Sequence, residues 1–449
     1  MQPGNKASII PDMTATLQEL PSVDQMLDTP AAARLLEQYN RDSVVDAVRE
    51  KIRQARDRLL HTGEECERIE LVARLEVDLR QWGQAEALPS LCRVINGTGI
   101  ILHTGLGRAP LPAAALDAAA AAAANYCNLE VEMESGKRGS RLTHVDTLIC
   151  AMTGAEAAAV VNNNAAAVLL MLSSLARGRK VLVSRGELVE IGGSFRIPDI
   201  IESSGARIHE VGTTNRTHLR DYASAVDGET AMILAVHPSN YRVQGFTARP
   251  ELAELAGLGR ERGIPVVYDL GGGVLEDLAR WRLPHEPVVR ETLRSGVDLV
   301  SFSGDKVLGG PQSGIVAGRR TYLERICGNP LMRALRCDKL TLAALEATLR
   351  LYRLGSDQLR EALPVLRMLT DPVEAVEGRA REVIERVAAS TRERLHPQVE
   401  SATAQAGSGA LPLEELPTWV IALQPARSSG EKLARRLRRQ SPGGMGRIH

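Results

Sequence analysis

The stretch Ser301-Phe302-Ser303-Gly304-Asp305-Lys306-Val307-Leu308-Gly309-Gly310-Pro311-Gln312 carries one lysine in a loop of small and turn-forming residues. The apolar run at 297–302 predicts a strand that leads into this loop. Lys306 is one of only seven lysines among 55 basic residues. Lysine, unlike arginine, can be desolvated, deprotonated and made into a Schiff base. Lys306 is therefore a candidate nucleophile, and a solvated loop lysine is the alternative.

Length and composition are typical of a globular enzyme with two or three domains. The 449 residues are 44% hydrophobic and 24% charged, and the formal net charge is zero, so no global field points to nucleic acid or a membrane. The six cysteines form no CxxC pair and no hydrophobic signal segment is present, which predicts reduced thiols and a cytoplasmic location. No apolar run approaches ~20 residues, so no membrane span is expected. No His and Cys cluster has metal-ligand spacing, so no metal is expected.

Residues 1–88 are predicted to form a helical N-terminal domain. Apolar residues recur at helical spacing from 31 to 82, and Ser22 is a candidate N-cap. The basic residues between 49 and 58 are compatible with a phosphate-backbone contact or with a solvated helix face interleaved with acids. Residues 1–90 hold 11 basic against 16 acidic side chains. Any nucleic acid bound here would be recognised by shape and local contacts.

Residues 89–330 are predicted to form a catalytic α/β domain. Strands are expected at 158–161, 180–184, 207–211, 231–236, 266–268 and 298–302, with helical patterns between several of them. This alternation indicates a mostly parallel sheet covered by helices. Ligands of such sheets bind at the C-terminal ends of the strands. The polar side chains that follow predicted strands, and are therefore expected to share one site, are Asn162, Thr213, His237, Asp269 and Lys306.

Residues 331–449 are predicted to form a small α+β C-terminal domain. The ranges 319–356 and 363–395 look helical, 416–423 reads as a strand and 430–439 as a basic helix. Arg333 and Arg336 are three residues apart, which would place both on one helix face.

An aspartate, a crossover and a lysine in a small-residue loop match what pyridoxal phosphate needs. Asp269 ends a hydrophobic strand, where a carboxylate is compatible with a metal ligand, a general base or a partner for a cationic ring nitrogen. With Lys306 as the Schiff-base lysine, the ring-nitrogen role completes a cofactor site. His237 is a candidate to stack on the cofactor or to form a hydrogen bond with it.

The cofactor phosphate has a candidate binding site of its own. Asn162-Asn163-Asn164 precedes a predicted helix at 165–176, whose first N–H groups would hold a phosphate at the positive end of the helix dipole. Ser303, three residues before the lysine, would add a hydroxyl.

Eight long motifs resemble the bacterial selenocysteine synthase family, the L-seryl-tRNA(Sec) selenium transferases, which are fold-type-I pyridoxal phosphate enzymes. They lie at 93–108, 136–144, 162–167, 184–199, 211–216, 237–247, 268–273 and 301–311. The resemblance covers nearly the whole chain, including the helical N-terminal domain. It implies conversion of seryl-tRNA(Sec) to selenocysteinyl-tRNA(Sec), by β-elimination of the serine hydroxyl to an aminoacrylate and addition of selenium from selenophosphate.

The resemblance also implies roles for individual residues. Lys306 becomes the cofactor lysine and Cα base, and Asp269 the pyridine partner. The residues implied to form the selenophosphate pocket are Arg108, Arg333, Arg336, Thr213, Thr214 and Asp305, the last counted with Lys306 as catalytic. The family forms a ring-shaped homodecamer whose N-terminal domain holds the tRNA. It usually continues past Gly446-Arg447-Ile448 into a last strand, whereas this sequence stops at His449.

Two other functions are compatible with parts of the pattern. The same catalytic domain would suit a pyridoxal phosphate lyase acting on a small amino acid or amino-sugar acid, but such a lyase has no need of residues 1–88. A catalytically silent tRNA-binding protein would not need both Asp269 and Lys306.

Overall fold

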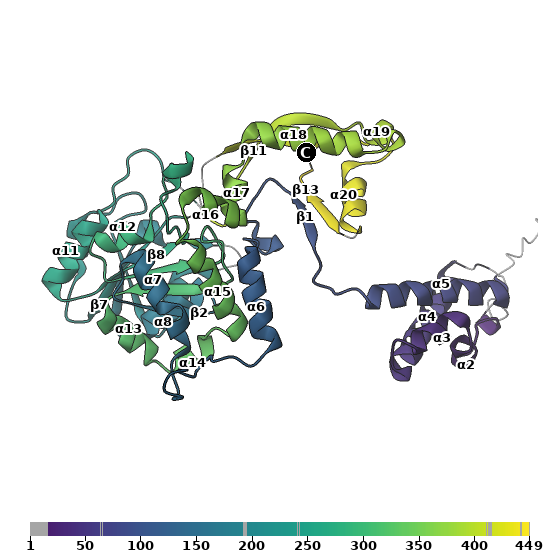
Figure 1. The fold of residues 1–449 in the computed structure, drawn as a ribbon, viewed down its shortest axis with the longest axis horizontal. Coiled ribbons are helices and arrows are strands. Elements are labelled where there is room, and N and C mark those ends of the chain that lie inside the picture. The colour runs from purple at the N-terminus through teal and green to yellow at the C-terminus, as the bar shows by residue number, and fades with distance from the viewer. Residues whose placement is uncertain are drawn as a thin grey trace, which may run out of the picture. The chain divides into compact units, whose positions relative to one another are not determined.

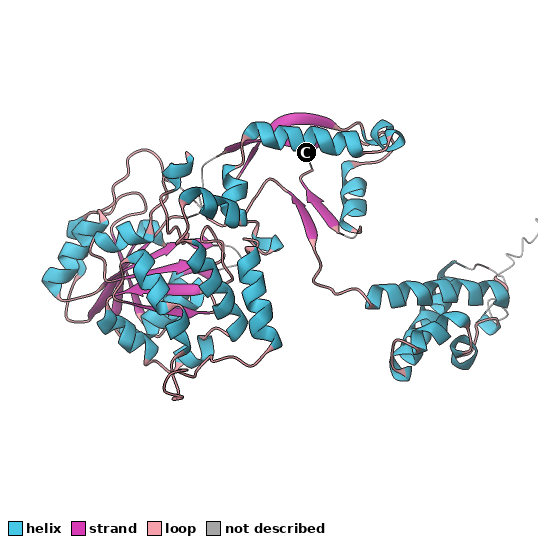
Figure 2. Ribbon diagram, in the orientation of Figure 1, coloured by secondary structure: helices cyan, strands magenta, loops and turns pink. Residues whose placement is uncertain are grey.

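The computed structural model describes residues 17–62, 64, 66–191, 195–239, 241, 243–409, 411, 415–440 and 442–448. The chain divides into two compact units, Met1–Arg93 and Val94–His449. Figure 1 labels their elements and Figure 2 colours them by type. Residues 1–16 of the predicted N-terminal domain and His449 lie outside the described residues.

The first unit is helical in its described part. Its helices are α2 (Val23–Leu27), α3 (Pro30–Leu36), α4 (Arg41–Thr62) and α5 (Arg68–Glu86). Ser22 caps α2 as predicted, because its hydroxyl accepts the Gln25 N–H while the Gln25 side chain accepts the Ser22 N–H. A core of its own joins these helices through Met26, Ala31, Ala32, Leu35, Val44, Val48, Leu75 and Leu79.

Three of the five arginines of α4 are paired with acids. Arg49 contacts Asp46, Arg53 contacts Glu50 and Asp57, and Arg58 contacts Asp78 of α5, at 2.6–3.3 Å. These pairs are exposed, so each contributes little to stability. They fit the solvated, acid-interleaved face better than an unpaired phosphate-binding strip.

A seven-stranded sheet organises the second unit (Figure 2). Its strands, in spatial order, are β2 (Ala157–Val161), β10 (Gly314–Gly318), β9 (Leu299–Ser303), β8 (Val266–Gly271), β7 (Thr230–Val236), β3 (Lys180–Ser184) and β6 (Arg207–Val211). Only β10 runs antiparallel to its neighbours. The predicted mostly parallel α/β fold is confirmed. Within this sheet β10 is the strand that sequence reasoning missed, because it is only a three-residue apolar run between Gly314 and Gly318.

Helices cover both faces of the sheet, as the alternation of β2 illustrates: Ala158 and Val160 join one core, while Ala157, Ala159 and Val161 join the other. The first core is covered by α7 (Asp146–Thr153), α10 (Leu219–Ala225), α11 (Leu252–Arg262), α12 (Val289–Arg294) and α15 (Lys339–Leu351). The second is covered by α8 (Asn164–Leu175), α9 (Ile197–Ser203) and α13 (Arg320–Cys327). The strands are therefore apolar on both sides, as buried parallel strands must be.

The remaining elements lie before, between and after these strands and helices along the chain. They are β1 (Val94–Gly97), α6 (Ala113–Ala124), β4 (Glu190–Ile191), β5 (Phe195–Arg196), α14 (Leu331–Leu335), α16 (Ser356–Ala362), α17 (Pro364–Thr370), α18 (Val373–Arg386), α19 (Ala389–Leu395), β11 (Gln398–Ala404), β12 (Leu416–Ala422), α20 (Gly430–Arg438) and β13 (Gly443–Gly446). The predicted continuous helix at 363–395 is three helices. Pro372, the N-cap of α18, separates this helix from α17, and the non-helical Val387 and Ala388 separate α18 from α19. Strand β13 pairs with β1 in parallel, which joins the end of the described chain to the start of this unit.

Within the described part of the chain, no helix is long and apolar enough to cross a membrane.

Candidate active site

Lys306 lies in the turn between β9 and β10. The turn is closed by its own backbone, since the Gly304 N–H donates to the Ser313 carbonyl and the Gly309 N–H to the Lys306 carbonyl. The lysine is only 6% exposed, so the structure contradicts the alternative of a solvated loop lysine. Gly271, at the end of β8, lies beside the amine, and its φ of 73° is a conformation that favours glycine.

Asp269 of β8 is buried and held by two donors. The Asn164 amide donates to its Oδ1 at 2.8 Å and the Ser301 hydroxyl donates to the same oxygen at 3.0 Å. Oδ2 accepts no hydrogen bond from any described residue. Burial raises the pKa of the carboxyl, and the two donors and Lys306 act against this shift. A cationic partner at Oδ2 would stabilise the carboxylate further.

The charge on Lys306 is disfavoured by its surroundings. Burial, followed by the nearby Arg108 guanidinium, lowers the pKa of the amine, while Asp269 and Asp305 act in the opposite direction. Arg108 donates to Asp305 Oδ2 at 2.7 Å, so this pair lies directly beside the lysine. The backbone of Arg108 has a φ of 61°, which is unusual for a residue with a side chain and is typical of functional sites.

Arg108→Gln is expected to move the reactivity of Lys306 to higher pH. The variant removes a cation that lowers the pKa of the amine and leaves Asp305 unpaired, and both changes favour the protonated form. The measurement is the pH dependence of cofactor loading onto apo-protein, which requires a neutral amine. Arg108→Lys, which keeps the charge, is the control. A loading profile unchanged in Arg108→Gln would contradict this electrostatic role.

His237 follows β7 and joins the same strand ends. Its ring Nδ1 lies 3.0 Å from the Tyr268 hydroxyl, and its backbone N–H donates to the Asp269 backbone carbonyl. Burial lowers the pKa of its imidazole to about 4, so the ring is neutral at physiological pH. A neutral imidazole whose Nδ1 accepts a hydrogen bond from the tyrosine hydroxyl carries its own proton on Nε2. His237 can therefore donate a hydrogen bond to a ligand.

The start of α8 follows the asparagine-rich turn for which the sequence predicts a phosphate site. The Asn163 side chain accepts the Ala166 N–H, which caps the helix and leaves the first N–H groups of the turn available. Asn162 is tied by its N–H to the Leu335 carbonyl, and Asn164 turns to Asp269. Ser303, the last residue of β9, is buried.

The residues present fit pyridoxal phosphate. Among the described residues, the buried Oδ1 of Asn164 and Oγ of Ser239 have no hydrogen-bond partner. Such orphaned polar atoms at strand ends are expected where a polar ligand completes the site. A neutral-prone amine, a carboxylate with a free oxygen and a helix N-terminus together match an aldehyde, a pyridine nitrogen and a phosphate.

Thr213 and Thr214 lie in the exposed loop after β6. The Thr213 hydroxyl donates to the Arg216 carbonyl at 2.8 Å and thereby stabilises the loop. Thr214 lines a cavity of about 200 Å³ that also contains Pro238 and Arg249. This cavity adjoins the Asp269 strand end, because Pro238 follows His237 and the Arg249 guanidinium lies 5.9 Å from the Tyr268 ring centroid.

Arg333 and Arg336 line a different cavity, of about 300 Å³, together with Glu130, Arg138 and Arg141. Four guanidinium groups and one carboxylate line it, and the pKa of the Glu130 carboxyl is lowered first by Arg141 and then by Arg138 and Arg336. The cavity is therefore cationic. Arg108 is not among the described residues that line it.

The prediction that Arg333 and Arg336 share a helix face is wrong. Helix α14 ends at Leu335, and Arg336 follows it in extended conformation, bridged to Val161 of β2. Its guanidinium lies 3.4 Å from Glu130. The two arginines still line the same cavity, but the break between helix and strand brings them there.

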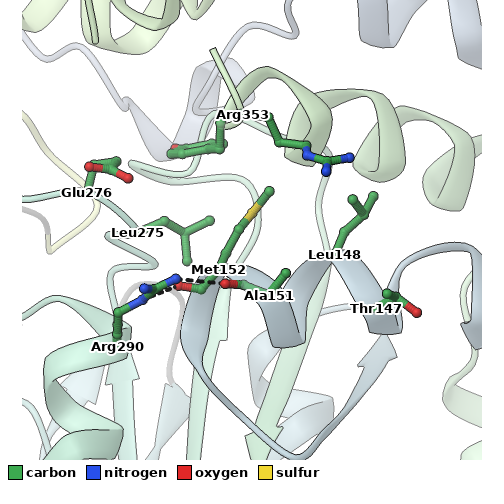
Figure 3. Close-up of a pocket in the computed structure, with 9 residues that line it drawn as sticks. Thr147, Leu148, Ala151, Met152, Leu275, Glu276, Arg290 and Arg353 are labelled. Carbon is green, nitrogen blue, oxygen red and sulfur yellow. Dashed lines mark hydrogen bonds between the residues drawn. The ribbon is translucent and has the colours of Figure 1, made fainter. Parts of the chain in front are cut away.

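A further cavity, of about 400 Å³, contains none of the predicted site residues. It is lined by Thr147, Leu148, Ala151, Met152, Leu275, Glu276, Arg290, Tyr352 and Arg353 (Figure 3). Figure 3 shows Arg290 donating to the carbonyls of Ala151 and Met152, at 2.7 Å each. Arg290 thus supplies hydrogen-bond donors to the carbonyls in the last turn of α7, and its role is structural. No group of three or more metal-ligating side chains occurs among the described residues.

Sequence reasoning missed the residues that support the site. Ser301, Tyr268 and Glu187 are buried polar groups in or near strands, and their partners come from distant segments. A serine inside an apolar strand was the only available signal for Ser301.

The fold is shared with D-glucosaminate-6-phosphate ammonia-lyase, whose solved structure matches with a TM-score of 0.56 and 19% identity over 82% of this chain and 89% of that one. That likeness concerns the fold. Taken with the lysine and aspartate at the strand ends, the protein falls in the class of fold-type-I pyridoxal phosphate enzymes.

The family model described as L-seryl-tRNA selenium transferase matches residues 94–449, and one described as selenocysteine synthase N terminal matches residues 17–56. The L-seryl-tRNA(Sec) selenium transferase of Carboxydothermus hydrogenoformans is 46% identical over 96% of this chain and 92% of its own length. That of Methylocella silvestris is 47% identical with the same coverage. The chain belongs to the L-seryl-tRNA selenium transferase family.

Proposed function

We propose that this protein converts seryl-tRNA(Sec) to selenocysteinyl-tRNA(Sec), taking selenium from selenophosphate. Membership of the family supports the substrate, and the buried Lys306 beside Asp269 is the single observation that carries the chemistry. In the overall change the serine hydroxyl leaves as water, selenium bonds to Cβ, and hydrolysis of the selenium–phosphorus bond releases phosphate and leaves a selenol. The ester to tRNA stays intact.

Bound pyridoxal phosphate supplies a ring that accepts the electron pair released at the substrate Cα. Lys306 would hold the cofactor through its amine. As a free amine it would take the Cα proton, since burial favours its neutral form. Asp269 would accept a hydrogen bond from the protonated ring nitrogen. Asn164 and Ser301 keep its carboxylate oriented, while the first turn of α8 and Ser303 bind the phosphate.

The selenium donor is a multiply charged anion, and the protein offers guanidinium groups for it. Arg108, Arg333 and Arg336 are proposed to bind selenophosphate, with Thr213, Thr214 and Asp305 completing the pocket. Arg333 makes no ion pair with any described residue, so its charge is available for a ligand. Planar guanidinium groups bind tetrahedral anions through paired, charge-assisted hydrogen bonds.

We further propose three domains, at 1–88, 89–330 and 331–449, of which the first holds the tRNA. The active assembly is proposed to be a ring-shaped homodecamer in the cytoplasm. In this assembly, Arg108 of one chain and Arg333 of another are proposed to line a single pocket.

The function is tested by incubating the protein with seryl-tRNA(Sec), labelled selenophosphate and pyridoxal phosphate, and scoring labelled selenocysteinyl-tRNA. Product formation is expected. Release of pyruvate or ammonia from a free amino acid or amino-sugar acid, with no labelled tRNA, would instead support the lyase alternative.

Arg333→Gln and Arg336→Gln are each expected to raise KM for selenophosphate by about 10-fold or more, because each removes charge-assisted hydrogen bonds to the anion. The KM for seryl-tRNA should change far less. Arg325→Gln is a matched control, since Arg325 of α13 donates to the Ser174 carbonyl, outside the cationic cavity. Equal selenophosphate KM values in all three variants would remove these arginines from the pocket.

A further inference from the structure

Phe246 is an exposed aromatic side chain. The chain has three phenylalanines. Phe302 is fully buried, whereas Phe246, in the loop between β7 and α11, is 83% exposed. A single exposed ring is common on protein surfaces, so a binding role is inferred from the contacts around this ring.

The loop that carries Phe246 is held in place from a second loop. The Asn215 amide donates to the Phe246 carbonyl at 2.7 Å, and Arg216 Nε donates to the same oxygen at 3.1 Å. The backbones are also joined, because the Ala248 N–H donates to the Asn215 carbonyl and the Thr217 N–H to the Ala248 carbonyl. The exposed ring is therefore presented on a braced segment.

A cation accompanies the ring. The Arg216 guanidinium carbon lies 5.7 Å from the Phe246 ring centroid. Arg216 makes no ion pair with a described residue, so its charge is not neutralised nearby. The guanidinium lies over one face of the ring and leaves the other face of this 83% exposed side chain open to a ligand. An open aromatic face close to an unpaired planar cation is the combination that proteins use for unpaired nucleobases and their phosphates.

The pair borders the cavity next to the candidate active site. Arg216, Thr214 and Thr247 line the 200 Å³ cavity, whose other wall includes Pro238 and Arg249. Those two residues neighbour His237 and Tyr268. Arg216 and Thr247, the residue after Phe246, thus line a cavity whose other wall contacts residues around the Asp269 strand end.

We propose that Phe246 and Arg216 bind the unpaired 3′-terminal nucleotide of the aminoacyl-tRNA, the base stacking on the ring and the phosphate pairing with the guanidinium. This inference rests on the proposed function. The seryl group is esterified to the terminal ribose, so the terminal base must bind close to Lys306 whenever the amino acid reaches it. The adjoining cavity receives the ribose and base edge.

The test uses tRNA(Sec) carrying 2-aminopurine as its terminal base, because stacking quenches the fluorescence of this base. The wild-type holoenzyme and Phe246→Tyr are expected to quench the signal on binding, and Phe246→Ala to lose the quenching. In turnover, Phe246→Ala should raise KM for seryl-tRNA by about 10-fold, the loss of one stacked base, with kcat little changed. Arg216→Gln should raise the same KM and weaken its salt dependence.

Tyr126→Ala is the matched control, since it removes another exposed aromatic ring, one that, unlike Phe246, is not next to a residue lining the 200 Å³ cavity. Phe246→Ala with wild-type quenching and KM would overturn the proposal. A changed oligomer size in Phe246→Ala with unchanged quenching would identify the ring as a subunit contact and overturn it too. If the wild-type protein itself makes no selenocysteinyl-tRNA, the proposed function fails, whereas an active wild type with an unaffected Phe246→Ala fails this inference alone.

Discussion

Lys306→Ala is expected to lower selenocysteinyl-tRNA formation by at least about 10³-fold, because the variant lacks both the amine that holds the cofactor and the base that takes the Cα proton. The visible absorbance of the amine-linked cofactor should disappear from the purified protein. Turnover with labelled selenophosphate and the absorbance spectrum are the two measurements. The fold should persist, since the turn is closed by hydrogen bonds between backbone groups.

Lys180→Ala provides the control for this variant. Lys180 begins β3, at the opposite end of the strands from the active site, and its amine pairs with Asp227 and Glu229 on the surface. It should retain wild-type turnover and the cofactor band. A Lys306→Ala protein that keeps the band or most of the activity would show that another group holds the cofactor.

Strand-end reasoning explains why part of the site is predictable from the sequence. In a parallel sheet the residues that follow successive strands meet at one edge, so Asp269, His237 and Lys306 can be grouped from their positions after apolar runs. The structure places His237 in contact with Tyr268 and Asp269. Lys306 lies close enough to lower the pKa of His237 and of Asp269. Periodicity also locates the buried strands, since runs of aliphatic residues between turns are distinctive.

The rest depends on tertiary contacts that periodicity does not encode. The asparagine-rich turn predicts a phosphate cradle, but the Asn164 amide supports Asp269, 105 residues away in sequence. Three-residue spacing predicts a helix for Arg336, but bridging to Val161 makes its backbone extended. Strand β10 adopts its direction only because it returns beside β9 after the lysine turn. In each case a partner distant in sequence decides the local structure.

Removal of the N-terminal helical unit is expected to abolish use of seryl-tRNA while leaving the cofactor site intact. A chain beginning at residue 89 removes α2 to α5 cleanly, because α5 ends at Glu86. The helical unit has its own core, in which the Tyr39 and Trp82 rings lie 5.4 Å apart, so its loss should leave the core of the second unit undisturbed. We expect kcat/KM for seryl-tRNA(Sec) to fall by roughly 100-fold or more, equivalent to about 2.8 kcal/mol of lost binding.

The decisive comparison sets this shortened protein against two substrates, full-length seryl-tRNA(Sec) and a seryl minihelix that contains only the acceptor arm. If the helical unit grips the body of the tRNA, the full chain should prefer the tRNA strongly over the minihelix, and the shortened chain should treat the two alike. Its visible cofactor band and its oligomer size should match those of the full chain. Unchanged turnover of the full tRNA by the shortened protein would show that the helical unit does not bind tRNA. The acid-paired arginines of α4 would then have only a structural role.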